Sequence, residues 1–177
     1  MLFRSSQLSI NYFDVGNDFY KKNDFISAIF YYEKYLSPFY ENFNNSFTPY
    51  TVSVKQKELK DNNTYLADAL YRTAESYRRL SIHDKAVNYY REVLKKKSSK
   101  YPLIKFHYAH ELKALGQFAE AKQMIESFLV EYKKNDSFKK EAQGAISSID
   151  LGIQEFKKKD VQYFVQKPLQ FERKDTG

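Results

Sequence analysis

The stretch ALYRTAESYRRLSIHDKAVNYYREVL, residues 69–94, decides the fold. Its apolar residues recur at the spacing of two amphipathic helices. The first helix is marked by Leu70, Ala74 and Tyr77, and the second by Ala86, Tyr90 and Val93. Ala74 and Ala86 lie twelve residues apart, and small side chains there let two helix backbones approach closely. We therefore predict a helical hairpin whose seam passes between these two alanines.

The same spacing occurs twice more in the chain. Gly16 and Ala28 are twelve residues apart, and so are Ala109 and Ala121. Each pair lies among apolar residues at helical spacing, which predicts an internal repeat of about 34 residues. The predicted hairpins cover residues 8–38, 65–97 and 102–133, in one repeat domain spanning residues 1–159.

Three further segments depart from this repeat. Residues 42–63 are rich in Asn, Ser, Thr and Pro, and we expect them to be a mobile insertion between the first two hairpins. Residues 136–159 predict one more amphipathic helix, with Asp136 or Ser137 as its cap, which covers the open end of the third hairpin. Residues 160–177 predict an extended tail or a linker toward a further domain, with VQYFV at 161–165 as a short strand.

The composition favours long helices and an exposed polar surface. The chain of 177 residues has only 5 Gly and 4 Pro but 16 Tyr and 15 Phe, which leaves little material for the turns of a β fold. Its net charge is +7, with lysine runs at 95–97 and 157–159. Both runs are expected at helix C-termini, where cations complement the helix dipole. We therefore favour solvated helix ends over a nucleic-acid site.

Several kinds of chemistry are excluded or not expected. The chain has no cysteine, so disulfides, thiolate metal sites and cysteine nucleophiles are excluded, while the compartment stays open. No apolar run reaches the roughly 18 residues of a membrane helix, and the first ten residues lack a signal-peptide core. The chain is expected to be either cytosolic or an excised domain without its targeting signal.

The sequence predicts neither an enzyme nor a cofactor. It contains no Gly-rich phosphate loop, HExxH, GxSxG or paired-carboxylate motif. His107 and His110 lie three apart on one predicted helix, a spacing compatible with two metal ligands on one face. No third ligand is obviously placed to join them, although Glu111 is adjacent, so we expect two half-buried histidines and no metal site.

The repeat resembles the tetratricopeptide repeat (TPR). The resemblance covers most of residues 8–133, with His83 and Lys105 standing where large apolar or aromatic residues are usual. It implies an all-α, right-handed superhelix of three hairpins, closed by the capping helix and followed by the tail, whose role is to bind proteins. The residues that match the repeat are Tyr12, Gly16, Phe19, Phe25, Ala28 and Tyr32; Leu70, Ala74, Tyr77, Ala86 and Tyr90; and Ala109, Leu112, Gly116, Phe118, Ala121 and Ile125.

A narrower resemblance concerns residues 67–94 and 107–129. These segments are similar to the N-terminal TPR region of OmpA-family outer-membrane lipoproteins of Bacteroidetes. The capping helix followed by DVQYFVQKPLQF at 160–171 also resembles the passage in those proteins from the repeats to a β-propeller. That resemblance implies a scaffold linked to type IX secretion and gliding motility, at the periplasmic face of the outer membrane. It also implies an excised domain that meets the membrane only through a lipid anchor outside this chain, with envelope or secretion-system components as partners.

Two alternatives follow from the residues themselves. One is a cytosolic TPR adaptor or regulator that binds a peptide in its concave groove. The other is a basic helical repeat that binds nucleic acid, a partner that we do not expect because the lysines are spread along the chain.

The TPR resemblance also implies a binding groove, since the first helix of each hairpin lines the concave surface. The predicted partner-binding residues are Phe13, Asn17 and Tyr20; Tyr71, Glu75 and Arg78; and Phe106, His110 and Lys113. Such a face mixes aromatic anchors with charged groups, as peptide binding requires. The alternative is that the rings only fill the inside of a short superhelix. Phe13, Arg72 and His107 replace the lysine, asparagine and arginine of the carboxylate clamp of co-chaperones, so that function is not expected.

Overall fold

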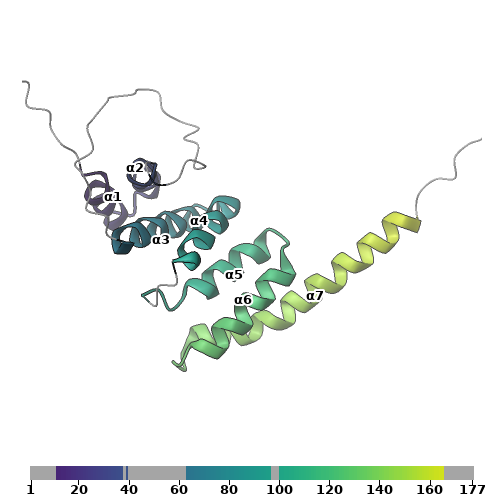
Figure 1. Cartoon of the computed structure of the whole chain (residues 1–177). Coiled ribbons are helices and arrows are strands. Elements are labelled where there is room, and N and C mark those ends of the chain that lie inside the picture. The colour runs from purple at the N-terminus through teal and green to yellow at the C-terminus, as the bar shows by residue number, and fades with distance from the viewer. Residues whose placement is uncertain (1–10, 38, 40–62, 97–99, 166–177) are drawn as a thin grey trace, which may run out of the picture.

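Three helical hairpins follow one another along the chain and a single long helix closes the array (Figure 1). The computed structural model describes residues 11–37, 39, 63–96 and 100–165. Within these residues every element is a helix, which confirms the all-α prediction. The helices are α1 (Tyr12–Lys21), α2 (Phe25–Leu36), α3 (Asn63–Arg79), α4 (His83–Lys95), α5 (Ile104–Ala114), α6 (Phe118–Glu131) and α7 (Ser137–Val165).

Each helix packs against the next one along the chain, and α1 also contacts α3 while α5 contacts α7. The first helices of the hairpins, together with α7, therefore form one layer, and α2, α4 and α6 form the other. The expected hairpins are present, with the first helix beginning at Tyr12. Most of the predicted insertion at 42–63 lies outside the described residues, and only Asn63 is seen, as the first residue of α3.

The three hairpin turns share one backbone conformation. Asn23, Ser81 and Gly116 each have a positive φ, of 59°, 57° and 74° respectively. In each turn the residue after this position donates its N–H to a carbonyl five residues earlier, as Asp24 does to Phe19, Ile82 to Tyr77 and Gln117 to Leu112. This is the Schellman ending of a helix, which reverses the chain within a few residues. One turn geometry thus repeats with the sequence period.

The small residues of the repeat lie at the helix seams, as predicted. Ala28, Ala74, Ala86 and Ala121 are completely buried and Ala109 is 1% exposed. Gly16 faces the ring of Tyr32, and a Cβ atom at Gly16 would lie 2.8 Å from two ring carbons. Side chains larger than these would therefore separate the paired helices.

The last helix is longer than the sequence indicated. Asp136 caps it, since its Oδ1 accepts the N–H of Lys139 at 3.3 Å, and Ala142, Ala145 and Ile149 are buried against the rest of the array. The helix then continues to Val165 (Figure 1). The predicted strand at 161–165 is wrong, because no strand among the described residues is available to pair with it and an existing helix gains one hydrogen bond per added residue.

The extension of α7 also corrects the reading of the second lysine run. Residues 157–159 lie within α7 and not at its C-terminus. The first run agrees with the prediction as far as it is described, since Lys95 ends α4 and Lys96 is its C-cap. Residues 166–177, the rest of the predicted tail, lie outside the described residues. None of the described helices combines the length and the apolar character needed to cross a bilayer.

Candidate functional site

A band of polar and charged side chains crosses the layer formed by α1, α3, α5 and α7, and we call it the inner face. Tyr20 on α1 lies within electrostatic reach of the α3 side chains. The charges of Glu75 and Arg78 on α3 act on His107 of α5. Those of Lys113, also on α5, and Glu141 on α7 act on His110. The inner face therefore consists of Asn17, Tyr20, Arg72, Glu75, Arg78, Arg79, His107, His110, Lys113 and Glu141.

Arg72 is held in place by neutral groups from the first hairpin. Its Nη1 donates to Asn17 Oδ1 at 2.9 Å, and the same oxygen accepts the hydroxyl of Tyr32 at 2.8 Å. The guanidinium lies 5.5 Å from the centre of the Tyr20 ring, within the range of a cation–π contact. Burial raises the pKa of Tyr32 to about 12, so its hydroxyl stays protonated. Arg72 is thus a positioned cation that forms no ion pair with the described carboxylates.

Glu75 is the one buried carboxylate of the inner face, and it is neutralised locally. It accepts the Nη2 of Arg78 at 2.7 Å and a short hydrogen bond from the hydroxyl of Tyr90. Burial disfavours its charged form, but the hydrogen bonds from Arg78 and Tyr90 and the charge of Arg78 outweigh that effect and lower its pKa. The Glu75–Arg78 pair therefore stays ionised at neutral pH and adds no net charge.

The two histidines of α5 are neutral at physiological pH. Burial lowers the pKa of His107 to about 4 and also lowers the pKa of His110. The His110 ring packs on Phe106 at 4.5 Å between ring centres, and its buried Nε2 has no hydrogen-bond partner. Across the described part of the chain, no group of three or more His, Cys, Asp or Glu is placed to hold a metal ion.

Cations outnumber carboxylates on the inner face. Arg72, Arg78 and Arg79 on α3, with Lys113 on α5, face only Glu75 and Glu141. Lys113 is bonded to the neutral hydroxyl of Ser148 at 2.8 Å. Since the imidazoles are uncharged, the inner face carries a net positive charge, concentrated on α3.

The structure separates the predicted binding residues into two groups. Asn17, Tyr20, Arg78, His110 and Lys113 lie half-buried on the inner face, which brings residues of three hairpins together. Glu75 also lies there, but it is only 5% exposed and is occupied by Arg78 and Tyr90.

The three other predicted residues are aromatic, and their rings pack within the fold instead of facing a partner. Phe13 and Phe106 are 6% and 4% exposed and belong to the hydrophobic core. The prediction that they face a partner is corrected, because their rings fill the interior, Phe13 against α2 and α3 and Phe106 against α6 and α7. Tyr71 is half-buried and stacks on Tyr101 at 4.1 Å between ring centres, so it supports the junction between the second and third hairpins.

Four residues of the inner face were absent from the prediction: Arg72, Arg79, His107 and Glu141. Arg72, Arg79 and His107 each directly follow a predicted inward position on the same helix. The band is thus wider than one row of residues per helix. Glu141 lies outside the prediction because the apolar stripe of α7 indicates only a cap, whereas its first turns also extend the same layer.

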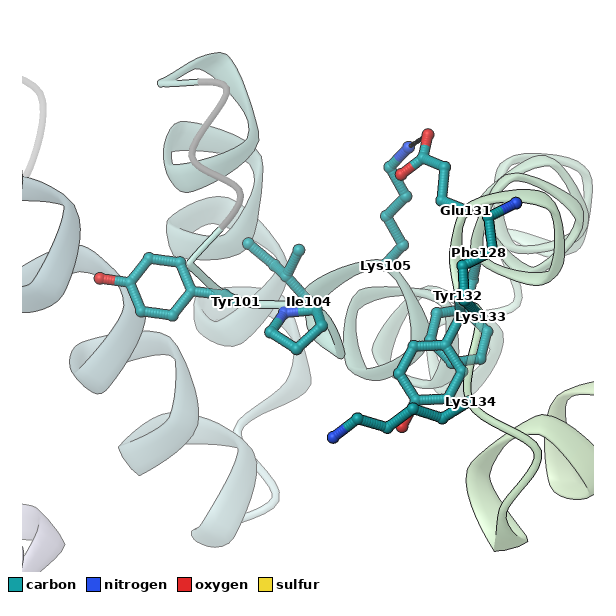
Figure 2. Close-up of a pocket in the computed structure, with 9 residues that line it drawn as sticks. Tyr101, Ile104, Lys105, Phe128, Glu131, Tyr132, Lys133 and Lys134 are labelled. Atoms are coloured by element: carbon teal, nitrogen blue, oxygen red, sulfur yellow. Dashed lines mark hydrogen bonds and ion pairs between the residues drawn. The ribbon is translucent and has the colours of Figure 1, made fainter.

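A separate pocket of about 380 Å³, the edge pocket, lies at one end of the third hairpin, between residues 101–105 at the start of α5 and residues 128–134 at the end of α6 (Figure 2). The stacked rings of Phe128 and Tyr132 form its apolar wall, and Lys133 and Lys134 lie at its rim. Figure 2 shows Lys105 and Glu131 meeting on one side, where they form an ion pair. Lys105 therefore replaces the usual apolar residue of the repeat without leaving an unpaired charge. Another hollow, of about 400 Å³, lies between the α5–α6 turn and α7, beside Phe118, Ile153 and Phe156.

Comparison with known proteins agrees with this architecture. The family model of the tetratricopeptide repeat matches residues 68–97, which contain most of α3 and all of α4. The match and the helical hairpins support a TPR domain. Repeats of this kind are typically non-catalytic modules that bind proteins or peptides. No curated protein matches the chain.

Proposed function

We propose that this chain is a non-catalytic protein–protein interaction scaffold that holds a polypeptide segment on its inner face. The observation that carries the proposal is the gathering of Tyr20, Arg72, Arg78 and His110 from three successive hairpins. Tyrosine and arginine are the side chains that most often dominate binding energy at protein interfaces. An extended segment that crosses α1, α3 and α5 meets all of them.

The wider role that we propose is that of the TPR module of a periplasm-facing protein associated with the outer membrane and with type IX secretion. The support for this setting is the resemblance of residues 67–94 and 107–129 to the TPR region of OmpA-family lipoproteins. In this proposal, the membrane attachment comes from a lipid anchor outside the chain. The partners are other components of the cell envelope or of the secretion system.

Site-specific photocrosslinking in the cells of origin tests both parts. A photoreactive phenylalanine analogue replaces Tyr20 on the inner face, and in a matched control it replaces Ile26, which is 72% exposed on α2. We expect a discrete crosslinked product from position 20 only, containing an envelope or secretion-system protein. Equal products from both positions would contradict binding on the inner face.

The crosslinked protein also separates the two settings. A cytosolic protein captured at position 20 would retain the interaction scaffold and overturn the envelope setting. The gene that encodes the chain offers a second test, because the proposal requires an upstream signal with a lipid-attachment cysteine and a downstream propeller domain.

A further inference from the structure

We infer that the segment held by the inner face is acidic, and that its carboxylates pair with Arg72 and Arg79 of α3. This inference rests on the proposed function, since it names the chemistry of the partner at the same surface. It predicts that side chains of Asp or Glu lie against the α1–α3 part of the inner face and not against α7.

The first argument is the state of Arg72. Its guanidinium is fixed by Asn17 Oδ1 and by the Tyr20 ring, and both are neutral. A guanidinium has five N–H donors; Nη1 donates to Asn17 and the neutral hydroxyl of Tyr32 lies within reach, so most of the donors remain and neither neighbour supplies a negative charge. The side chain is half-buried, so part of it remains open to solvent. A preorganised arginine with free donors binds a carboxylate in a two-point geometry at little entropic cost.

The second argument is the supply of carboxylates around α3. Glu75 is committed to Arg78 and Tyr90. Asp68, on the same helix, is committed to Lys100, with an Nζ–Oδ2 distance of 2.6 Å, and to Tyr101. Arg79 is exposed and forms no ion pair or hydrogen bond with the described side chains. Two cations of α3 therefore lie next to Tyr20 without an internal counter-ion.

The third argument is the gradient of charge along the inner face. At its other end the imidazoles of α5 are neutral, and the charge of Lys113 is balanced by Glu141 of α7, whose carboxylate lies 3.8 Å from His110 and is largely exposed. An acidic segment is therefore attracted most strongly at the α3 end, while Glu141 repels it locally at the α7 end. Electrostatic complementarity of this kind sets the orientation of a partner as well as its rate of association.

The pocket of Figure 2 is a weaker receptor for the same chemistry. One of its three lysines, Lys105, is already paired with Glu131, and Lys133 donates to the carbonyl of Val130 at 2.9 Å. The pocket is nevertheless a second basic surface, so a variant in it can be compared with variants of the inner face.

A displayed library of random peptides of about twelve residues, long enough to extend over roughly 40 Å, tests the inference on the whole chain. Selection is carried out at about 50 mM salt, where charge pairing is weakly screened. We expect the recovered peptides to be enriched in Asp and Glu. Their affinities are then measured by fluorescence anisotropy with the parent chain and its variants.

The variants are matched in charge. Arg72→Gln and Arg79→Gln are each expected to weaken binding roughly tenfold, as loss of a well-placed charge pair does. Arg72→Lys should recover only part of the loss, because lysine lacks the two-point fork. Lys85→Gln on the exposed side of α4 removes the same charge elsewhere and should leave affinity unchanged. Arg79 has no described partner within the fold, so its variant tests binding even if Arg72→Gln destabilises the chain.

Each result distinguishes the inference from the function on which it rests. Neutral or basic peptides whose binding requires Tyr20 would overturn the acidic partner and keep the interaction scaffold. Acidic peptides that respond to Lys134→Gln and not to Arg79→Gln would place the acidic site in the edge pocket and overturn the inference. If no peptide were recovered, both the inference and the peptide-binding function would fail. A single-stranded oligonucleotide bound through Arg72 and Arg79 more tightly than any peptide would favour nucleic acid instead.

Discussion

Tyrosine–carboxylate hydrogen bonds connect the hairpins at the scale of single residues. Glu33 of α2 accepts the hydroxyls of Tyr77 and Tyr89, from α3 and α4, at 2.6 Å and 2.8 Å. Burial, followed by the nearby carboxylate, raises the pKa of both tyrosines, so both remain donors throughout the physiological range. The abundance of tyrosine therefore has a structural explanation, since each ring fills a seam while its hydroxyl is bound across it.

Tyr89→Phe tests the value of these bonds. Tyr89 is 1% exposed, and the substitution removes only its hydroxyl. Hydrogen bonds to charged groups contribute about 1.5–3 kcal/mol, so the free energy of unfolding should fall by about that amount in urea denaturation. Tyr31→Phe is the matched control, because the Tyr31 ring stacks on Phe19 while its hydroxyl has no described partner. Equal stabilities of the two variants would contradict the assignment.

The neutral histidines make stability depend on pH. The pKa of His107 is about 4 in the folded chain, because it is buried, against a usual value of 6.5. As the pH falls from about 6.5 toward 4, the unfolded chain binds a proton that the folded chain rejects, and stability decreases. Burial acts on His110 in the same direction.

Thermal unfolding at several pH values measures this effect. The melting temperature should fall between pH 7 and about 5, a window above the usual titration of carboxylates, so that Glu75 contributes little there. His107→Gln should flatten the slope. The neighbours that act on His107 are Glu75, Arg78, Arg79 and His110, and the variant leaves all of them in place. An unchanged slope in the variant would show that His107 does not carry the effect.

At the scale of the elements, the same turn conformation recurs in all three hairpins. Gly116 adopts its positive φ without strain, and asparagine tolerates this region better than most residues. Ser81 has φ 57° with an ordinary side chain, and such a residue costs roughly 1–2 kcal/mol, partly offset by the lower backbone entropy of serine in the unfolded chain.

Ser81→Gly should therefore stabilise the chain. The expected gain is about 0.5–1 kcal/mol, since the relief of strain exceeds the added entropy cost of glycine. The reciprocal change, Gly116→Ser, places the same residue in the equivalent turn and should cost a similar amount. Guanidinium denaturation of both variants measures the pair. A loss of stability in Ser81→Gly would mean that its side chain supports the turn.

The seam between α3 and α4 is the second feature at this scale. Ala74 and Ala86 are both completely buried, so the two helices are as close as their side chains permit. Ala86→Leu should overpack the seam and cost roughly 1–3 kcal/mol. Calorimetry would detect it as a lower melting temperature, and an unchanged value would remove Ala86 from the seam. The exposed Ala119 on α6 offers a control with the same added volume.

At the scale of the whole molecule, each hairpin is stabilised by packing against its neighbours. α7 packs on α6 and, through its first half, on α5, so it closes the apolar end of the array. Arrays of this type behave as a sum of repeat stabilities and interfaces between neighbours. Loss of the closing helix should therefore be felt most in the third hairpin.

Removal of residues 136–177 tests this arrangement by hydrogen exchange. We expect amides of α6 to lose protection strongly and amides of α1 and α2 to lose little. A chain ending at Lys158 keeps the described contacts of α7, including Phe156 with Phe118, and should protect α6 as the full chain does. A uniform loss of protection in all helices would instead indicate that the molecule unfolds as one unit.

The sequence alone determined the hairpins and their seams. The twelve-residue spacing of Gly16–Ala28, Ala74–Ala86 and Ala109–Ala121 is a local requirement of two packed helices, so it is written within each repeat. The turn at Gly116 and the cap at Asp136 are equally local. The end of α7 was not predicted, because VQYFV has the alternation of a strand and only the absence of a pairing strand, together with helix propagation, decides against it.

The tertiary structure alone decided which side chains form the inner face. Phe13 and Phe106 occupy positions of the repeat that face inward in pattern, but both are buried by other helices. Phe13 packs against rings of α2 and α3, and Phe106 against rings of α6 and α7. Arg72 is positioned by Asn17, 55 residues earlier, and Glu75 is held by a hydrogen bond from the hydroxyl of Tyr90 on the next helix. Burial, charge and free donors at a surface are set by contacts between helices, and the apolar periodicity along a single helix does not determine them.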